Sequence, residues 1–249
     1  MIDFGDNTSG NPPGMTDTHP RRHVPLTVLA AALAFGTGAM DVASVTRLGG
    51  VFSSVMTGNL VLLGLAAARP SGELAVHTAL AFAGYVTGAA LGTWIAGSPR
   101  PREQTWPVAV TMTLVVELAV MGGFSAGWEL THAQPTGGPQ LALLVVATLG
   151  MGLQSAAVRG LGTTVSTTYL TGTLTGVVAS LVAQPRSRHL DHRGVAVLTT
   201  VALGAAVSGV LILTTPAVLP ALPLATLTAV IATAAYHHTP QTGTARSRP

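Results

Sequence analysis

Apolar residues gather in eight long runs along the chain, and short polar joints separate these runs. Each run approaches the roughly 20 residues that a helix needs to cross the hydrocarbon core of a bilayer. Seven prolines fall in the joints, where the missing backbone N–H costs least. The pattern therefore predicts helices over 26–45, 51–68, 74–96, 107–124, 141–158, 165–183, 195–215 and 217–236.

Composition indicates a membrane protein. Of 249 residues 48% are hydrophobic and only 8% charged, with a mean hydropathy of +0.53, whereas about 25% charged residues would be ordinary for a soluble domain. Aromatic residues make up 4%, too few for the girdles of an outer-membrane barrel, and the runs do not alternate as barrel strands do. We expect an all-α polytopic integral membrane protein with six to eight transmembrane helices.

Charge and cysteine usage exclude several classes of protein. The net charge of +3 comes from arginines that stand singly or in pairs between apolar runs, which is typical of membrane topology and not of a nucleic-acid surface. Cysteine is absent, so the chain has no disulfide, thiolate metal site or thiol nucleophile. Residues 1–24 and 237–249 are polar and are predicted to be disordered tails around one transmembrane domain, 25–236.

An internal repeat appears when residues 114 positions apart are compared. The run Thr57-Gly58-Asn59-Leu60 corresponds to Thr171-Gly172-Thr173-Leu174. Further identities in the same register are Gly36 with Gly150, Gly38 with Gly152, Ala43 with Ala157 and Val51 with Val165. We expect two repeated halves, about 26–124 and 141–236.

Two topologies are compatible with the eight runs. If all eight cross, eight arginines lie on the cytoplasmic side and four outside. If the second and sixth runs enter and return on one side, only Arg47 and Arg69 lie outside, which follows the positive-inside rule better. The second topology gives inverted halves, as in many secondary transporters, although runs 51–68 and 165–183 are long enough to cross. Both place the N-terminus in the cytoplasm.

Two paired motifs resemble a known family. The first comprises Gly38-Ala39-Met40-Asp41-Val42-Ala43-Ser44, Gly49-Gly50-Val51-Phe52 and Met56-Thr57-Gly58-Asn59-Leu60-Val61-Leu62-Leu63-Gly64. The second comprises Met151-Gly152-Leu153-Gln154-Ser155-Ala156-Ala157-Val158-Arg159 and Thr167-Thr168-Tyr169-Leu170-Thr171-Gly172-Thr173-Leu174-Thr175. Together they are similar to the YoaK-like family of bacterial membrane proteins, domain of unknown function 1275, although Ser155 stands where members often carry Asn. The resemblance implies a multi-pass protein of the bacterial cytoplasmic membrane with about six spans, and no particular reaction.

Glu117 is the clearest candidate for a functional side chain. It lies near the middle of run 107–124 among Val115, Val116, Leu118 and Ala119. A charge at the bilayer centre costs at least about 2.5–3.5 kcal/mol on insertion scales, which makes an acid there a functional candidate. Proton coupling in a transporter is one interpretation, and a neutral carboxyl bonded to a neighbouring hydroxyl is the other.

Other polar residues lie in the repeated motifs. Asp41 precedes Arg47 by six residues, and Gln154 precedes Arg159 in the second half, so one interpretation is charge neutralisation at helix ends by these arginines. The alternative is a shared polar site where the halves meet. The residues proposed for that substrate- or ion-binding site are Asp41, Thr57, Asn59, Glu117, Gln154, Thr171 and Thr173.

Glycines at every fourth position mark one helix face. Gly84, Gly88 and Gly92 allow close approach of another helix. We interpret this face as helix packing, either between the halves or in a homo-oligomer.

Catalytic motifs are weak. Gly123-Phe124-Ser125-Ala126-Gly127 matches G-x-S-x-G but follows an apolar helix where a hydrolase has a strand. The histidines lack metal-ligand spacing, and no nucleotide-binding motif occurs. We therefore expect a protein that is not an enzyme, needs no cofactor or metal, and has as partners the lipid bilayer and a small solute or proton. A secondary transporter or permease is the leading interpretation, and a membrane scaffold acting through helix contacts is the alternative.

Overall fold

The computed structural model describes residues 26–69, 71–97, 106–161, 170–182 and 191–238. Eight α-helices and one short 3₁₀ helix occupy these ranges, and no strand occurs in them. The predicted tails lie outside the described residues except for His237 and His238, which form the last turn of a helix. The elements are α1 (Leu26–Arg47), α2 (Met56–Ala68), α3 (Gly72–Ala96), α4 (Val108–Leu130), α5 (Gly137–Gly160), α6 (Leu170–Val182), α7 (His192–Thr214), η1 (Pro216–Val218) and α8 (Ala221–His238).

Six of the described helices are long and apolar enough to cross a membrane, namely α1, α3, α4, α5, α7 and α8. The helices α2 and α6 have 13 residues each and reach about 20 Å at 1.5 Å per residue, which is short of the roughly 30 Å hydrocarbon core. The all-α membrane fold is confirmed, with six candidate spans and two short apolar helices.

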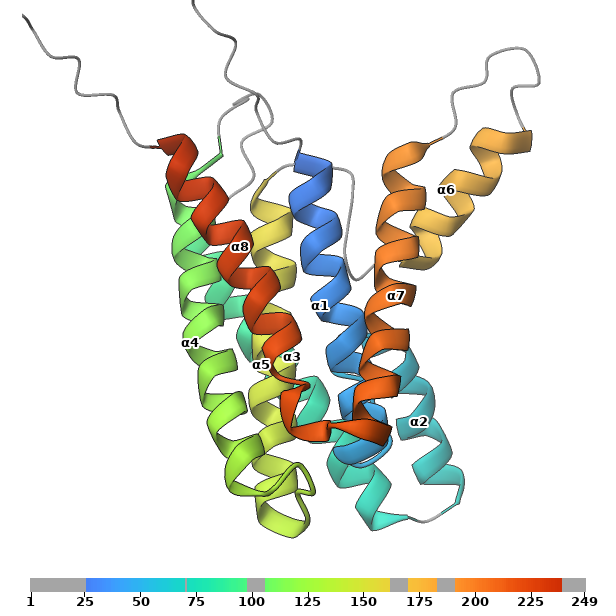
Figure 1. The fold of residues 1–249 in the computed structure, drawn as a ribbon. Helices are drawn as coiled ribbons and strands as arrows, with labels where there is room; N and C mark the ends of the chain where they lie inside the picture. The colour runs from blue at the N-terminus through green and yellow to red at the C-terminus, as the bar shows by residue number, and fades with distance from the viewer. Residues whose placement is uncertain (1–25, 70, 98–105, 162–169, 183–190, 239–249) are drawn as a thin grey trace, which may run out of the picture.

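Successive long helices run in opposite directions (Figure 1). In that view α1, α4 and α7 descend while α3, α5 and α8 ascend. The short helix α2 lies in the lower half of the molecule, and α6 lies in the upper half. The starts of α1 and α7 and the ends of α5 and α8 therefore lie at one end of the bundle.

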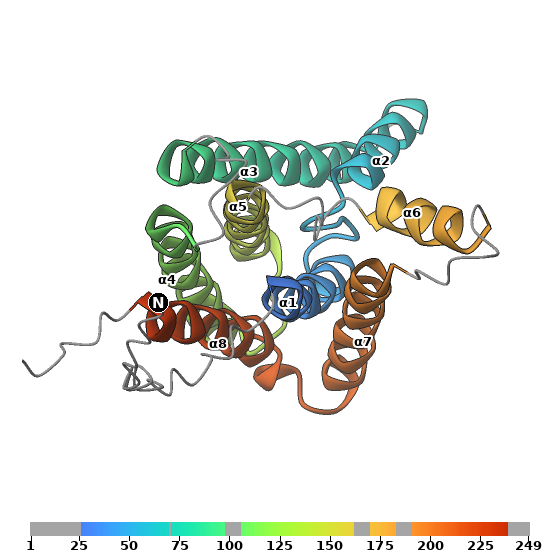
Figure 2. The same ribbon diagram turned by 90° about the horizontal axis from the view of Figure 1, so that it is seen from above.

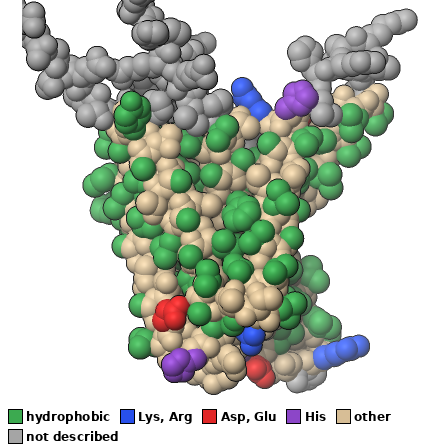
Figure 3. All heavy atoms as spheres, viewed as in Figure 1, with side chains coloured by type: hydrophobic (Ala, Val, Ile, Leu, Met, Phe, Trp, Pro, Cys, Tyr) green, Lys and Arg blue, Asp and Glu red, His purple; other side chains and the backbone are tan. Residues whose placement is uncertain are grey.

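The surface has an apolar middle and charged ends (Figure 3). On the face shown, arginine, acidic and histidine side chains lie near the two ends, while hydrophobic and uncharged side chains cover the region between them. Large apolar side chains of the long helices are also exposed, such as Val86 of α3, Met112 of α4 and Leu203 of α7. This distribution suits a molecule whose middle faces lipid.

Seen along the bundle, α1 and α5 lie innermost, with α3 against α5 and α7 against α1 (Figure 2). The glycines of α3 make the first contact possible, because a Cβ on Gly88 would overlap the Leu149 carbonyl oxygen, and one on Gly92 would lie 2.7 Å from Ala156 Cβ. Gly84 meets the side chain of Thr148. The glycine face is thus covered by α5.

The contact of α7 with α1 is built in the same way. A Cβ on Gly204 would overlap the carbonyl oxygen of Phe35, which precedes Leu149 by the same 114 residues as the repeat. Likewise a Cβ on Gly38 would overlap the Val201 carbonyl oxygen, and one on Gly152 would overlap that of Tyr85. The positions in contact on α1 and α5 are 114 residues apart, and those on α3 and α7 are 116 residues apart.

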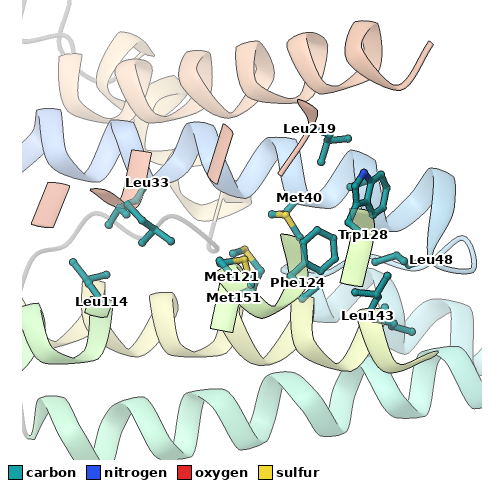
Figure 4. Close-up of a cluster of buried hydrophobic side chains, with 14 of the residues drawn as sticks. Leu33, Met40, Leu48, Leu114, Met121, Phe124, Trp128, Leu143, Met151 and Leu219 are labelled. Carbon is teal, nitrogen blue, oxygen red and sulfur yellow. The ribbon is translucent and has the colours of Figure 1, made fainter. Parts of the chain in front are cut away.

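A hydrophobic core runs along the centre of the bundle (Figure 4). Phe124 and Trp128 lie on one side of α4 with ring centroids 5.6 Å apart. The Trp128 indole Nε1 donates to the Pro216 carbonyl oxygen at 2.9 Å, which joins the end of α4 to the turn before α8. The labelled side chains around them come from several helices and include Met40, Met121, Leu143, Met151 and Leu219.

Among the boundaries that the structure describes, two differ most from the predicted ones. α4 continues to Leu130, past the predicted end at 124, because Trp128 still packs in the core. The run 51–68 is helical only from Met56, since the preceding backbone is held by side chains of α1 and α2, as described below. Ser71 and Asp191 cap the starts of α3 and α7, where their side chains accept from backbone N–H groups.

Candidate functional site

Three buried polar side chains form a hydrogen-bonded chain across α1, α5 and α4. Thr37 Oγ1 donates to Gln154 Oε1 at 2.6 Å, and Gln154 Nε2 donates to Glu117 Oε1 at 2.9 Å. None of the three side chains is more than 2% exposed. The fold therefore brings Gln154 into contact with Thr37, 117 positions away in the sequence, and with Glu117, 37 positions away.

The carboxyl group of Glu117 is the end of this chain. Its Oε2 atom is buried and has no hydrogen-bond partner among the described residues. Leu114 and Met121, one turn away on either side, are fully buried, and Met151 lies one turn before Gln154 on α5. The carboxyl thus ends in an apolar surrounding, where it can hold a proton or meet a ligand group with Oε2.

Asp41 lies in a separate arrangement that fixes the backbone before α2. Its Oδ1 accepts from the N–H groups of Ser53 and Ser54 at 2.9 and 2.8 Å and from Ser53 Oγ at 2.9 Å. Its Oδ2 accepts from Ser54 Oγ at 2.6 Å. This carboxylate is satisfied by hydrogen-bond donors, and Arg47 does not pair with it.

Asn59 holds the same segment from the other side. Its Oδ1 accepts from the Phe52 N–H at 2.9 Å, and its Nδ2 donates to the Phe52 carbonyl oxygen at 2.8 Å. The side chain is 1% exposed, so both ends of the amide are paired within the protein. Asp41 and Asn59 together order residues 52–54 at the start of α2.

The other predicted site residues lie apart from these two groups. Thr57 and Thr171 are exposed on the short helices, and Thr173 packs against Gly194 of α7. The backbone carbonyl oxygen of Arg47 accepts from Gln140 Nε2 at 3.0 Å. Arg159 is exposed near the end of α5, and no ion pair involving either arginine occurs among the described residues.

The structure adds residues that the sequence analysis missed. Thr37 lies one helical turn before Asp41 on α1 but bonds to Gln154 and not to Asp41. Ser53 and Ser54 lie in an apolar run and gave no signal as carboxylate partners. Tyr85 of α3 donates to Ser155 Oγ at 2.8 Å, which gives this serine a contact between helices.

Ser125 and His77 can also be placed. Ser125 lies inside α4, so its G-x-S-x-G match does not form a strand-to-helix turn. His77 is buried in the second turn of α3 and lies against Gly49, with Nδ1 2.8 Å from the Glu73 carbonyl oxygen. The described residues contain no group of three or more His, Cys, Asp or Glu that could hold a metal ion.

Comparisons with known proteins agree with the membrane fold. The model of a family described as "Protein of unknown function (DUF1275)" matches residues 29–235. The chain is 30% identical over 154 residues to the "UPF0700 transmembrane protein YoaK" of Bacillus subtilis (strain 168), a match that covers 61% of this chain and 66% of that protein, just under two thirds. No solved structure matches.

Proposed function

The protein belongs to the DUF1275 family of membrane proteins, and we propose that it is a small secondary transporter coupled to protons. The proposal starts from the buried, hydrogen-bonded side chains of Thr37, Gln154 and Glu117. The observation that carries this proposal is the Glu117 carboxyl group, fully buried in a membrane-spanning helix with one oxygen unpartnered among the described residues. A group of this kind is costly in a bilayer and is typical of proton relays and substrate pathways.

The position of the site supports transport. Glu117 is the tenth of the 23 residues of α4, so it lies near the middle of the span. Gln154 comes from the second predicted half, whereas Thr37 and Glu117 come from the first. Transporters built from repeats bind substrate and coupling ion near the midplane, where the repeats meet.

The arrangement of helices supports inverted halves. Three long helices in each half make α5 antiparallel to α1 (Figure 1), and the short helices α2 and α6 occupy opposite halves of the bundle. The corresponding contacts Gly88 to Leu149 and Gly204 to Phe35 are those expected when one half is rotated onto the other. In this topology α2 and α6 belong to segments that enter the membrane from opposite sides, and each segment returns to the side from which it entered.

Charge supports a cytoplasmic N-terminus. Arg47 and Arg69 lie at the lower end of the bundle, at the ends of α1 and α2, while Arg159 and Arg193 lie at the upper end. The other eight arginines lie outside the described residues, and by sequence they fall before α1, between α3 and α4, between α6 and α7, and after α8. These joints all connect upper helix ends, so the positive-inside rule makes that side cytoplasmic.

The scaffold interpretation has less support. It depended on a glycine face open to other proteins, and α5 covers the face formed by Gly84, Gly88 and Gly92. An enzyme is also disfavoured, because Ser125 lies within a regular helix. We propose solute movement across the bacterial cytoplasmic membrane without covalent chemistry.

The test uses purified full-length chain in proteoliposomes on a solid-supported membrane. Panels of amino acids, sugars, carboxylates and nucleosides are applied across a pH gradient, and the transient current is recorded. We expect at least one class to give a pH-dependent current that Glu117→Gln abolishes. Glu129→Gln is the matched control, since this acid is exposed near the end of the same helix, and it should leave the current intact. Undiminished current in Glu117→Gln would refute the coupling role, and wild-type currents equal to those of empty liposomes for every class would favour the scaffold.

A further inference from the structure

Gln154 can form its two hydrogen bonds in either of two directions. Its amide donates to Glu117 and accepts from Thr37 in the structure. A half-turn of the amide exchanges Oε1 and Nε2 without moving any other heavy atom. The same positions then allow Glu117 to donate to Gln154 and Gln154 to donate to Thr37.

The first direction suits an ionised Glu117. In it both Thr37 and Gln154 donate toward the carboxylate, and Glu117 Oε1 accepts. A proton added to this arrangement would have to sit on Oε2, which has no partner among the described residues. A buried donor without an acceptor is unfavourable, so this direction disfavours the neutral acid.

The second direction suits a protonated Glu117. The carboxyl O–H on Oε1 donates to Gln154, the Gln154 N–H donates to Thr37 Oγ1, and the Thr37 hydroxyl hydrogen needs a new acceptor. The Leu33 carbonyl oxygen provides it, since it already lies 3.1 Å from Thr37 Oγ1. Each hydrogen bond along the path then has a donor and an acceptor, and Glu117 Oε2 still has no partner among the described residues.

We infer that Gln154 is a positioning residue whose amide turns over when Glu117 gains or loses a proton, so that the hydrogen bonds reverse as far as the Leu33 carbonyl of α1. The inference rests on the proposed function. It assigns the mechanism by which a proton taken up by Glu117 from either side of the membrane changes the hydrogen bonds between the two halves. With Glu117 ionised, the Thr37 hydroxyl ties α1 to α5 through the short 2.6 Å bond. With Glu117 neutral, that hydroxyl bonds back to its own helix, and an amide N–H takes over the link to α5.

Other ionisable groups lie elsewhere on the helices that pack against α4. They are Glu73, His77 and Tyr85 on α3, Arg159 on α5, and Tyr236, His237 and His238 on α8, with Asp41 and Arg47 on the neighbouring α1. Among the side chains that the structure describes, the one hydrogen-bond partner of Glu117 is Gln154, and Glu117 forms no ion pair with any of them. Reversal of the chain is therefore assigned to Glu117 alone.

The experiment follows the amide and the carboxyl separately in full-length protein in lipid nanodiscs. Side-chain ¹⁵N-glutamine labelling gives six amide groups, from Gln104, Gln134, Gln140, Gln154, Gln184 and Gln241, and Gln154→Met assigns the one of interest. The infrared carboxylic acid band of Glu117 is assigned with Glu117→Gln. We expect the Gln154 amide signal to shift with the same pH midpoint as the Glu117 band between about pH 4 and pH 10, and to stay fixed in Glu117→Gln.

A matched pair of variants at position 37 tests the far end of the chain. Thr37→Ser keeps the hydroxyl and should leave the midpoint unchanged, while the isosteric Thr37→Val should change the proton affinity of Glu117 roughly three- to tenfold, as expected for one net hydrogen bond. Wild-type spectra decide the question even if Thr37→Val fails to fold. A static Gln154 signal beside a titrating Glu117, or a Thr37→Val midpoint equal to that of the wild type, overturns the inference.

The outcomes separate the inference from the proposed function. A static Gln154 with currents that still require Glu117 refutes only the amide reversal. Normal currents in Glu117→Gln beside a reversing amide refute only the proton coupling. A Glu117 band that never changes with pH refutes both.

Discussion

The substitution Gly152→Ala tests the close packing of α5 on α3. The new Cβ would lie 2.7 Å from Ala89 N and 3.0 Å from Gly88 C, and would overlap the Tyr85 carbonyl oxygen. Ordinary contacts of such atoms begin near 3.4 Å, so the two helices must separate by roughly 1 Å in a tightly packed interior. Overpacking of this kind costs about 1–3 kcal/mol, against a gain of at most about 1 kcal/mol from replacing a helical glycine by alanine.

We therefore expect Gly152→Ala to lower the free energy of unfolding by about 1–2 kcal/mol. The measurement is unfolding in mixed micelles of dodecyl maltoside and increasing dodecyl sulfate, followed by circular dichroism. Gly122→Ala is the control, because a Cβ at Gly122 in α4 meets no atom within 4 Å, and it should be neutral or stabilising. If Gly152→Ala were as stable as the wild type, the backbone approach of α3 and α5 would be less close than described.

Three further substitutions examine other contacts. Asp41→Ala should speed hydrogen exchange at Ser53 and Ser54, because their backbone N–H groups lose their acceptor. Asp41→Asn keeps an oxygen at that position and should not; equal exchange in both variants would contradict the assignment. Trp128→Phe should cost about 1 kcal/mol in the micelle assay through the lost bond to Pro216, and no loss would mean that ring packing alone matters. The chain has no cysteine of its own, so single cysteines can report the topology. Arg69→Cys should react with a membrane-impermeant maleimide added outside spheroplasts, whereas Arg193→Cys should react only after permeabilisation. Labelling of both positions from one side would exclude the inverted topology.

Periodicity and composition predicted most of the fold. The six long helices follow from apolar runs near 20 residues, because the bilayer fixes that length. The run 51–68 gave no sign of its own division, since Val51 and Phe52 are as apolar as the helix that follows. The break at Met56 depends on Asp41 and Asn59, whose bonds to residues 52–54 are visible only in three dimensions.

The candidate site was predicted in part. Glu117 and Gln154 were recognised because a bilayer makes any buried acid or amide conspicuous. Their contact with each other depends on the rotation of α4 against α5, which no sequence spacing encodes. Thr37 was missed because a threonine in a membrane helix ordinarily bonds to its own backbone, as its 3.1 Å contact with the Leu33 carbonyl also shows.

The chain of Thr37, Gln154 and Glu117 also has a consequence for biogenesis. Glu117 leaves the ribosome well before Gln154, which arrives 37 residues later on α5. Until then α4 carries its carboxyl group without the amide partner, and a lone acid of this kind inserts into lipid unfavourably. Stable membrane integration of α4 should therefore wait for α5. A polypeptide truncated before Gln154 should release α4 from the bilayer more readily than a polypeptide that ends after Gln154.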